Sequence, residues 1–93
     1  MTGLTQPFVN GIGGDLFAIY YEAKTGKLYG LNASGWTPKG QTIEWLKSKG
    51  VTKLEATGVH TITVPGAVAG WEALIKRFGK KSLAEVLAPA IHH

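Results

Sequence analysis

The sequence contains no cysteine, which removes two means of stabilising or activating a small protein. Without cysteine there is no disulfide framework, and no thiolate that could act as a nucleophile or a metal ligand. With 93 residues the chain forms one domain at most. A chain of this length buries only about 60–65% of its unfolded surface, so its margin of stability is thin.

Long apolar runs and concentrated charge are also missing. No stretch of about 18 apolar residues occurs, so no membrane span is predicted. The N-terminus does not show the charged and apolar blocks of a signal peptide, and the localisation stays unknown. Ten basic and six acidic residues give a net charge of +4. The lysines are scattered and form no basic stripe with interleaved aromatics, so no nucleic-acid partner is predicted.

Apolar residues, by contrast, are plentiful. They make up 44% of the chain and include three each of Trp, Tyr and Phe. This is more than so short a chain needs for its own core, and it indicates a surface that something else covers.

The stretch from Thr61 to Gly79 is the one around which the chain is organised. Four β-branched or apolar residues, Thr61–Val64, predict a strand, and Pro65 ends it and suits the first turn of a helix. Gly79 is placed for a left-handed helix cap. The helix between them carries one apolar stripe at three- and four-residue spacing: Val68, Trp71, Leu74, Ile75 and Phe78.

The first turn of this helix is almost bare, because it contains Gly66, Ala67, Ala69 and Gly70. Each glycine within a helix costs about 1 kcal/mol, so a close approach to this turn is expected. Close packing against another backbone is the favoured interpretation. An anion bound at the exposed N–H groups is the alternative.

A β-hairpin is predicted earlier in the chain. Leu16–Tyr21 is apolar on both faces, as in a strand that is covered on both sides. Ala23–Gly26 is a turn with Gly26 in the left-handed position, and Lys27–Leu31 is the returning strand. The glycine-rich corner Gly11–Asp15 precedes a strand and lacks the lysine of a phosphate-binding loop. Its glycines are therefore expected to allow positive φ or close strand approach.

The remaining segments contain two short helices and irregular chain. Met1–Asn10 and Val51–His60 are predicted to be irregular, and Asn32–Gly40 is a turn-rich loop with Trp36 at its centre. Thr42–Lys49 is a short helix with Ile43 and Leu46 inward and Gly50 closing it. Ser82–Glu85 is a capping box, and the helix that it opens is expected to be short, because Pro89 would break it or start a new one.

No active site follows from residue chemistry alone. The metal candidates are His60, His92 and His93, but no carboxylate or cysteine joins them at ligand spacing. Asp15 is the only aspartate, and the glutamates lie apart. We therefore name no catalytic residue, no metal ligand and no cofactor.

The order of four motifs carries a resemblance to a known family. In sequence order they are Gly11-Ile12-Gly13-Gly14-Asp15-Leu16-Phe17, Asn32-Ala33-Ser34-Gly35, Val64-Pro65-Gly66-Ala67-Val68-Ala69-Gly70-Trp71 and Leu87-Ala88-Pro89-Ala90-Ile91. Together they resemble γ-glutamyltranspeptidase over residues 7–91. The block that begins at Val64 is the most specific of the four.

This resemblance implies an α/β (α+β) fold, in which an antiparallel hairpin and helices form part of an N-terminal nucleophile hydrolase αββα sandwich. Residues 1–93 are then a single partial domain, a fragment of the large subunit. It lacks the threonine nucleophile that begins the family's small subunit. The implied partners are γ-glutamyl compounds such as glutathione, the rest of the large subunit and the small subunit. Members of the family are often periplasmic or secreted.

One position departs from the family pattern. In the loop after the hairpin, the family's best-known members offer an arginine that clamps the α-carboxylate of the donor. The matching residue here is Trp36, which offers a single neutral donor. Trp36 is thus the one candidate substrate-binding residue. The alternative is that its indole is packed, which is the commoner fate of a tryptophan.

The resemblance implies cleavage of γ-glutamyl amide bonds, with transfer of the γ-glutamyl group to water or an amino acid. This chain alone is expected to be inactive. The alternative from another functional class is a small interaction module that kept the scaffold and lost catalysis. A threonine-led segment encoded downstream would favour the enzyme.

Overall fold

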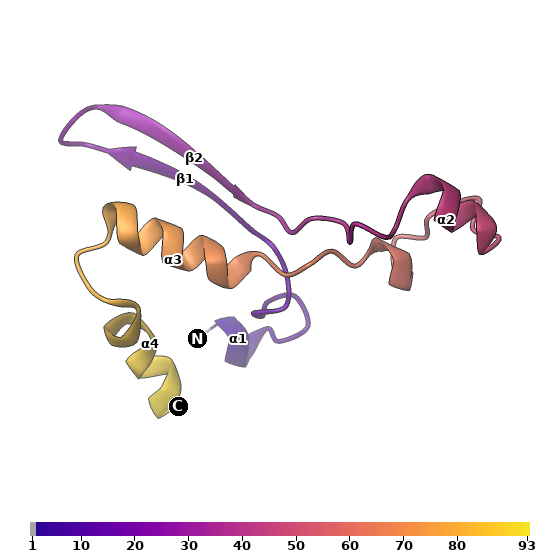
Figure 1. Ribbon diagram of the computed structural model, residues 1–93. Coiled ribbons are helices and arrows are strands. Elements are labelled where there is room, and N and C mark those ends of the chain that lie inside the picture. The colour runs from indigo at the N-terminus through magenta and orange to yellow at the C-terminus, as the bar shows by residue number, and fades with distance from the viewer. Residues whose placement is uncertain (1) are drawn as a thin grey trace.

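A computed structural model describes residues 2–93. It is α+β, as expected, with one two-stranded sheet and several helices (Figure 1). In chain order the elements are α1 (Thr2–Thr5), β1 (Leu16–Glu22), β2 (Lys27–Ala33), α2 (Ile43–Ser48), the 3₁₀ helix η1 (Val59–Thr61), α3 (Ala67–Phe78) and α4 (Leu83–His92).

Strands β1 and β2 form the predicted hairpin. They pair antiparallel from Leu16 opposite Ala33 to Glu22 opposite Lys27. The carbonyl of Glu22 accepts hydrogen bonds from Thr25 N and Gly26 N. Gly26 has φ +68°, so its predicted left-handed conformation is confirmed. The returning strand extends two residues beyond the predicted range.

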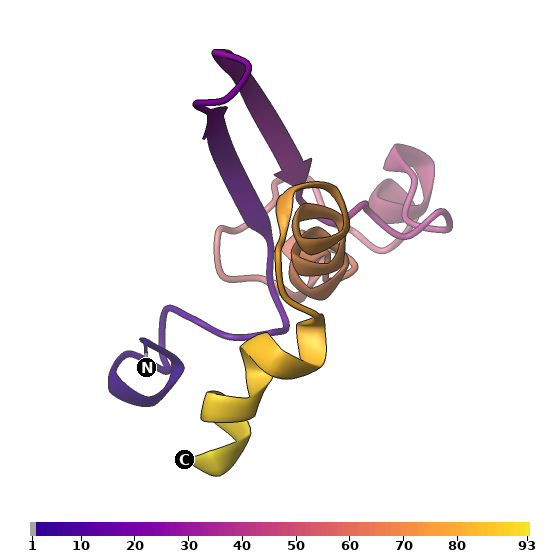
Figure 2. The ribbon, with the colours of Figure 1, turned by 90° about the vertical axis from the view of Figure 1, so that its left-hand side faces the viewer.

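Helix α3 packs along one face of this hairpin (Figures 1 and 2). The approach is close at Gly70, where a Cβ atom would lie 2.8 Å from Ala33 Cβ and 3.0 Å from Leu16 Cδ2. Ala67, in the first turn, is only 3% exposed. The small residues of this turn therefore serve close packing, as the favoured interpretation predicted.

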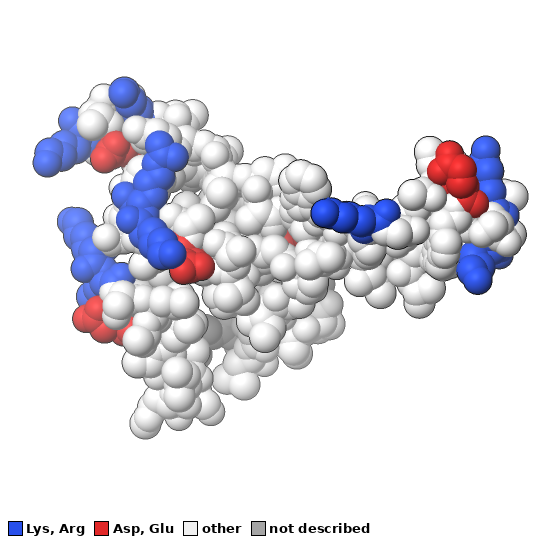
Figure 3. Space-filling view, viewed as in Figure 1, with Lys and Arg blue, Asp and Glu red and all other residues white. Residues whose placement is uncertain are grey.

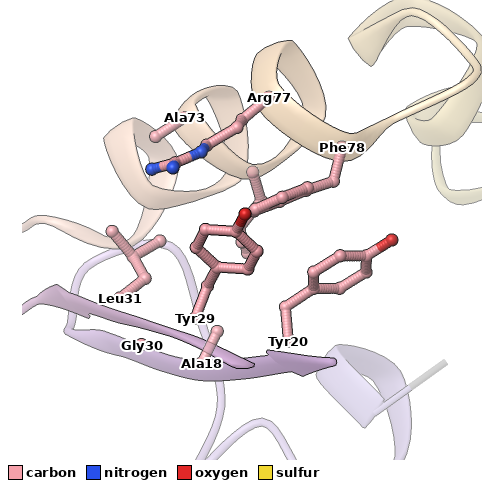
Figure 4. Close-up of a pocket in the computed structure, with 9 residues that line it drawn as sticks. Ala18, Tyr20, Tyr29, Gly30, Leu31, Ala73, Arg77 and Phe78 are labelled. Atoms are coloured by element: carbon pink, nitrogen blue, oxygen red, sulfur yellow. The ribbon is translucent and has the colours of Figure 1, made fainter. Parts of the chain in front are cut away.

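Aromatic side chains close the far end of the same interface. The ring of Phe78 stacks on Tyr20 with centroids 4.1 Å apart and lies 5.0 Å from the ring of Tyr29. The guanidinium of Arg77 lies 4.7 Å from the Tyr29 centroid, within reach of a cation–π attraction. These side chains surround a cavity of about 100 Å³ between the hairpin and α3 (Figure 4).

The opposite face of the hairpin is uncovered, contrary to the expectation of a strand buried on both sides. Phe17, Ile19 and Tyr21 alternate along β1 and are 68%, 81% and 62% exposed. Within residues 2–93, α3 is the helix that packs on the strands, and it covers one face. This chain therefore covers only one of the two apolar faces of β1.

The overall dimensions also show that the chain is extended and buries little of itself. The Cα radius of gyration is 17.3 Å, against about 12 Å for a compact domain of this length. Residues 39–61 form an arm that carries α2 and η1 away from the hairpin (Figure 1). In Figure 3 the charged side chains gather mainly at the two ends of the molecule, and the surface between them is almost uncharged.

The predicted strand at Thr61–Val64 does not form. Thr61 ends η1, and the chain then runs without regular structure to Gly66. The N–H of Val64 donates to the carbonyl of Trp36 at 3.0 Å. A strand requires a series of such hydrogen bonds to a neighbouring strand, and one bond does not supply it. The β-branched composition of this segment is therefore not sufficient to form a strand.

Two predictions about helix ends are also wrong. Gly79 has φ −71°, not a left-handed value. A Cβ there would lie 2.6 Å from the Ile75 carbonyl oxygen, so close approach explains this glycine. Helix α4 continues through Pro89 to His92. Proline lacks the N–H that would donate to the Glu85 carbonyl, and its ring crowds that carbonyl. The helix nevertheless continues, and His93 N donates to the Pro89 carbonyl.

The capping box at the start of α4 is confirmed. Ser82 Oγ accepts a hydrogen bond from Glu85 N, and Glu85 Oε2 accepts one from Ser82 N at 2.8 Å. The hydrogen bonds from Ser82 lower the pKa of Glu85. The charged Glu85 carboxylate therefore contributes its full stabilisation of the helix start when the pH is above the ordinary carboxyl pKa. This contribution is lost as the pH falls through the lowered pKa of Glu85.

The other short segments partly match their predictions. Helix α2 begins after Thr42, whose side chain accepts from Trp45 N, and Gly50 closes it with φ +77°. Ile43 was predicted to point inward but is 67% exposed, because no element lies beside the arm within residues 2–93. The predicted irregular segments contain two single turns, α1 and η1, and Met1 lies outside the described residues. No helix in residues 2–93 is long and apolar enough to span a membrane.

The uncovered face of the hairpin generates a prediction. Isolated residues 1–93 should self-associate and bind a dye that fluoresces on apolar surfaces, because exposed patches of this kind drive association. Ile19→Lys, on the open face, should reduce both effects, whereas Thr25→Lys in the hairpin turn should not. Gel filtration and dye titration measure this. A monomer with a sharp, cooperative melt at high temperature would contradict it.

Candidate functional site

An open groove of about 580 Å³ lies where the end of the hairpin meets the start of α3. One wall is the segment Leu31–Lys39, which includes the predicted loop. The other is formed by Val64–Gly66 together with Ala69, Gly70 and Ala73 of α3. Its volume is in the range of small-molecule sites. The groove thus contains residues of two of the four sequence motifs, those that begin at Asn32 and at Val64.

Asp15 connects the loop wall to Thr63, the residue that precedes the other wall. Its Oδ1 atom accepts a hydrogen bond from Gly35 N at 3.0 Å and a longer one from Thr63 Oγ1 at 3.4 Å. These donors lie 20 and 48 residues away in sequence. In the sequence Asp15 stands out only as the single aspartate, and this role was not predicted. The position of Asp15 in the glycine-rich corner was the sequence feature that could have indicated this role.

The neighbouring carbonyl of Gly14 holds the start of α3. It accepts hydrogen bonds from Gly66 N at 3.1 Å and Ala67 N at 3.0 Å. These two N–H groups are therefore satisfied within the chain, which disfavours an anion bound to them. The glycines of the corner were expected to have positive φ or close neighbours, and this was wrong. Only Gly26 and Gly50 have positive φ in residues 2–93, and a Cβ at Gly11, Gly13 or Gly14 would meet nothing within 4 Å.

The two walls cross at van der Waals contact. A Cβ at Gly35 would lie 1.4 Å from the Val64 carbonyl oxygen, and one at Gly66 would lie 2.2 Å from the Ala33 carbonyl oxygen. Asn32 Oδ1 accepts a hydrogen bond from Ser34 N at 2.9 Å and shapes the turn that leads to the crossing. Only glycine fits at Gly35 and Gly66 with the backbones in this position.

Trp36 lines the groove and is 85% exposed. Its carbonyl is held by Val64 N, while its indole is not packed within the described residues. The packed alternative for this tryptophan is therefore not realised in residues 2–93. Lys39 is the only charged side chain among the residues that line the groove. The sequence placed this lysine in the turn-rich loop but did not mark it as a candidate.

The histidines do not form a metal site. The ring of His60 lies edge-on to Trp45 in the arm, with centroids 5.8 Å apart. His92 and His93 lie at the other end of the chain, next to one another. Across residues 2–93, no three His, Cys, Asp or Glu side chains are grouped so as to hold a metal ion.

Two of the four motifs that carry the resemblance line the groove, and a family model decides the membership. The model for γ-glutamyltranspeptidase matches residues 1–93. The chain belongs to the γ-glutamyltranspeptidase family. Among curated relatives, it is 38% identical over 87 residues to the glutathione hydrolase-like YwrD proenzyme of Bacillus subtilis. It is 39% identical over 92 residues to the glutathione hydrolase proenzyme of Pseudomonas aeruginosa.

These two alignments cover 94% and 95% of this chain but only 16% of each relative. The chain therefore spans about one sixth of the length of the curated relatives that it matches. Among solved structures, it is similar to the γ-glutamyltranspeptidase of Helicobacter pylori, with a TM-score of 0.77 and 34% identity. That match covers 97% of this chain and 26% of the solved chain. The fold described above is thus shared with a member of the γ-glutamyltranspeptidase family.

The crossing at Gly35 can be tested with a matched pair of glycines. Gly35→Ala should lower the free energy of unfolding by about 1–3 kcal/mol, because its methyl group would displace Val64 from the crossing. Gly40→Ala, in open space in the same loop, should be neutral or slightly stabilising. Melting temperatures of the two variants measure the difference. Equal melting temperatures would show that the walls do not cross in this way.

Proposed function

We propose that residues 1–93 form one wall of the donor site in a longer enzyme that cleaves γ-glutamyl amide bonds. In such an enzyme a hydroxyl nucleophile attacks the γ-amide carbonyl and releases the amine, and the acyl group then passes to water or an amino acid. Membership of the γ-glutamyltranspeptidase family supports this reaction. The observation that carries the role of this chain is the groove between Leu31–Lys39 and the start of α3.

The chain is proposed to supply binding and not the nucleophile. The family resemblance puts the nucleophilic threonine at the start of a small subunit, and no catalytic residue is assigned among residues 1–93. The proposed substrates are γ-glutamyl compounds such as glutathione, and relatives that match this chain bear the name glutathione hydrolase. The open face of β1 supports further partners, namely the rest of the large subunit and the small subunit. Residues 1–93 are then one partial domain of that assembly.

Trp36 is proposed as a substrate-binding residue in this groove. It stands where the resemblance expects an arginine that binds the α-carboxylate of the donor, and its exposed indole carries no charge. Lys39 is the cation nearest in sequence, and it lines the same groove. A carboxylate bound by Lys39 would meet a point charge instead of the planar, bidentate fork of an arginine. Donor selectivity should therefore be weaker than with the arginine.

The first functional prediction concerns the isolated chain. Purified residues 1–93 should release no amine from a γ-glutamyl anilide above the buffer rate, because a covalent mechanism needs a nucleophile that this chain does not supply. The full-length protein is the positive control. Amine release by the isolated chain would place the chemistry within these residues. An inactive full-length protein that retains binding partners would instead favour the interaction module.

The second prediction tests Trp36 in the full-length protein. Trp36→Arg should tighten donors that carry an α-carboxylate by about tenfold to a hundredfold, since a hydrogen bond to a charged group contributes about 1.5–3 kcal/mol. Analogues without that carboxylate should bind as before. Trp36→Gln, which removes the indole without adding charge, is the control.

Donor affinity and melting temperature are measured on the same variants. If Trp36→Arg folds stably and does not improve discrimination between donors with and without the carboxylate, Trp36 is not part of the donor site. If both variants melt at much lower temperature, the indole is packed against another part of the full-length protein.

A further inference from the structure

The side chain of Asp15 accepts hydrogen bonds from one wall of the groove and from Thr63, the residue that precedes the other wall. Its Oδ1 takes one hydrogen bond from the loop wall, at Gly35 N, and one from the opposite segment, at Thr63 Oγ1. Asp15 is not among the residues that line the groove. The Asp15 carboxylate can therefore affect the position of the loop wall without itself lining the groove.

The two walls differ in how they are held. The start of α3 is held through backbone atoms, by the Gly14 carbonyl, and no side-chain substitution removes those hydrogen bonds directly. Gly35 N, by contrast, donates to the side chain of Asp15. The position of the loop that carries Trp36 therefore depends on Asp15, together with the hydrogen bond between Val64 N and the Trp36 carbonyl.

We propose that Asp15 is a positioning residue that holds the Gly35–Trp36 loop against the Thr63–Val64 segment, at the spacing that admits a γ-glutamyl donor. This inference rests on the proposed function of the groove. Loss of the carboxylate leaves Gly35 N without its acceptor, and the loop shifts away from the crossing. Donor binding then weakens. The chemical step should be unaffected, because Asp15 is not among the residues that line the groove.

The test compares four variants of the full-length protein: Asp15→Ala, Asp15→Asn, Thr63→Val and Glu44→Ala. Asp15→Ala removes both hydrogen bonds, while Asp15→Asn keeps an oxygen acceptor of the same shape. Thr63→Val removes only the hydroxyl donor. Glu44→Ala removes an exposed carboxylate from the arm, in the first turn of α2 and outside the groove, and serves as the control.

Two measurements are made on each variant. The first is KM and kcat for a γ-glutamyl anilide. The second is backbone amide hydrogen exchange over residues 34–38, which reports the loop directly and needs no substrate. Asp15→Ala should raise KM about tenfold with kcat within about twofold, the effect of losing a hydrogen bond to a charged acceptor. It should also speed exchange in the loop.

Asp15→Asn should restore KM to within about threefold of the wild-type value, and Glu44→Ala should change nothing. If Asp15→Ala does not fold, Thr63→Val decides the matter, with an expected rise in KM of about threefold at unchanged kcat. An active wild-type protein with unchanged KM in the Asp15→Ala or Thr63→Val variant would overturn this inference alone. So would a loss confined to kcat. A wild-type protein that turns over no γ-glutamyl donor would overturn the proposed function, and this inference with it.

Discussion

The structure depends on one crossing of the backbone, between the loop after the hairpin and the segment before α3. Gly35 and Gly66 let the chains approach to a distance that excludes any Cβ, and the corner at Gly14 and Asp15 supplies acceptors to both sides. Unpaired backbone N–H groups at a contact this tight would be costly. The glycine-rich corner satisfies several of them at once. It thereby fixes where the hairpin ends, where α3 begins and where the groove lies.

Away from this crossing the chain buries little of itself. Helix α3 covers one face of the hairpin, while the aromatic and aliphatic side chains on the other face of β1 stay open to solvent. Relatives of this chain are about six times longer, and the solved relative of the same fold is also longer than the matched part. The open apolar face of β1 agrees with the proposal that further layers of a longer protein pack on it.

The base and the rim of the groove differ in the residues that form them. Its base is backbone and small residues, held by hydrogen bonds that join distant segments. At its rim stand an exposed tryptophan and a single lysine. An aromatic surface beside one flexible cation selects ligands by shape and stacking more than by the bidentate geometry that an arginine would impose. Under the proposed function, the side chain at position 36 would bear on which donors bind, and Asp15 would set the position of the loop that carries it.

The sequence by itself determined the features that depend on near neighbours. The turn at Gly26, the caps at Thr42 and Ser82 and the apolar stripe of α3 all follow from residues within a few positions of one another. The four ordered motifs also identified the family. The loop predicted at Asn32–Gly40 was only partly correct: Asn32 and Ala33 continue β2, and the turn is confined to residues 39–40. Which of its side chains reach the groove was not predicted.

Only the tertiary structure decided the rest, because the partners are distant in sequence. No local pattern shows that Asp15 meets Gly35 and Thr63, or that Gly66 is required by the carbonyl of Ala33. The extended segment before Pro65 had the composition of a strand, but a strand also needs a partner along its length. Gly79 had the position of a left-handed cap but serves a close contact within α3. Composition sets what a backbone can adopt, and the neighbours that folding brings beside it decide which of those conformations occurs.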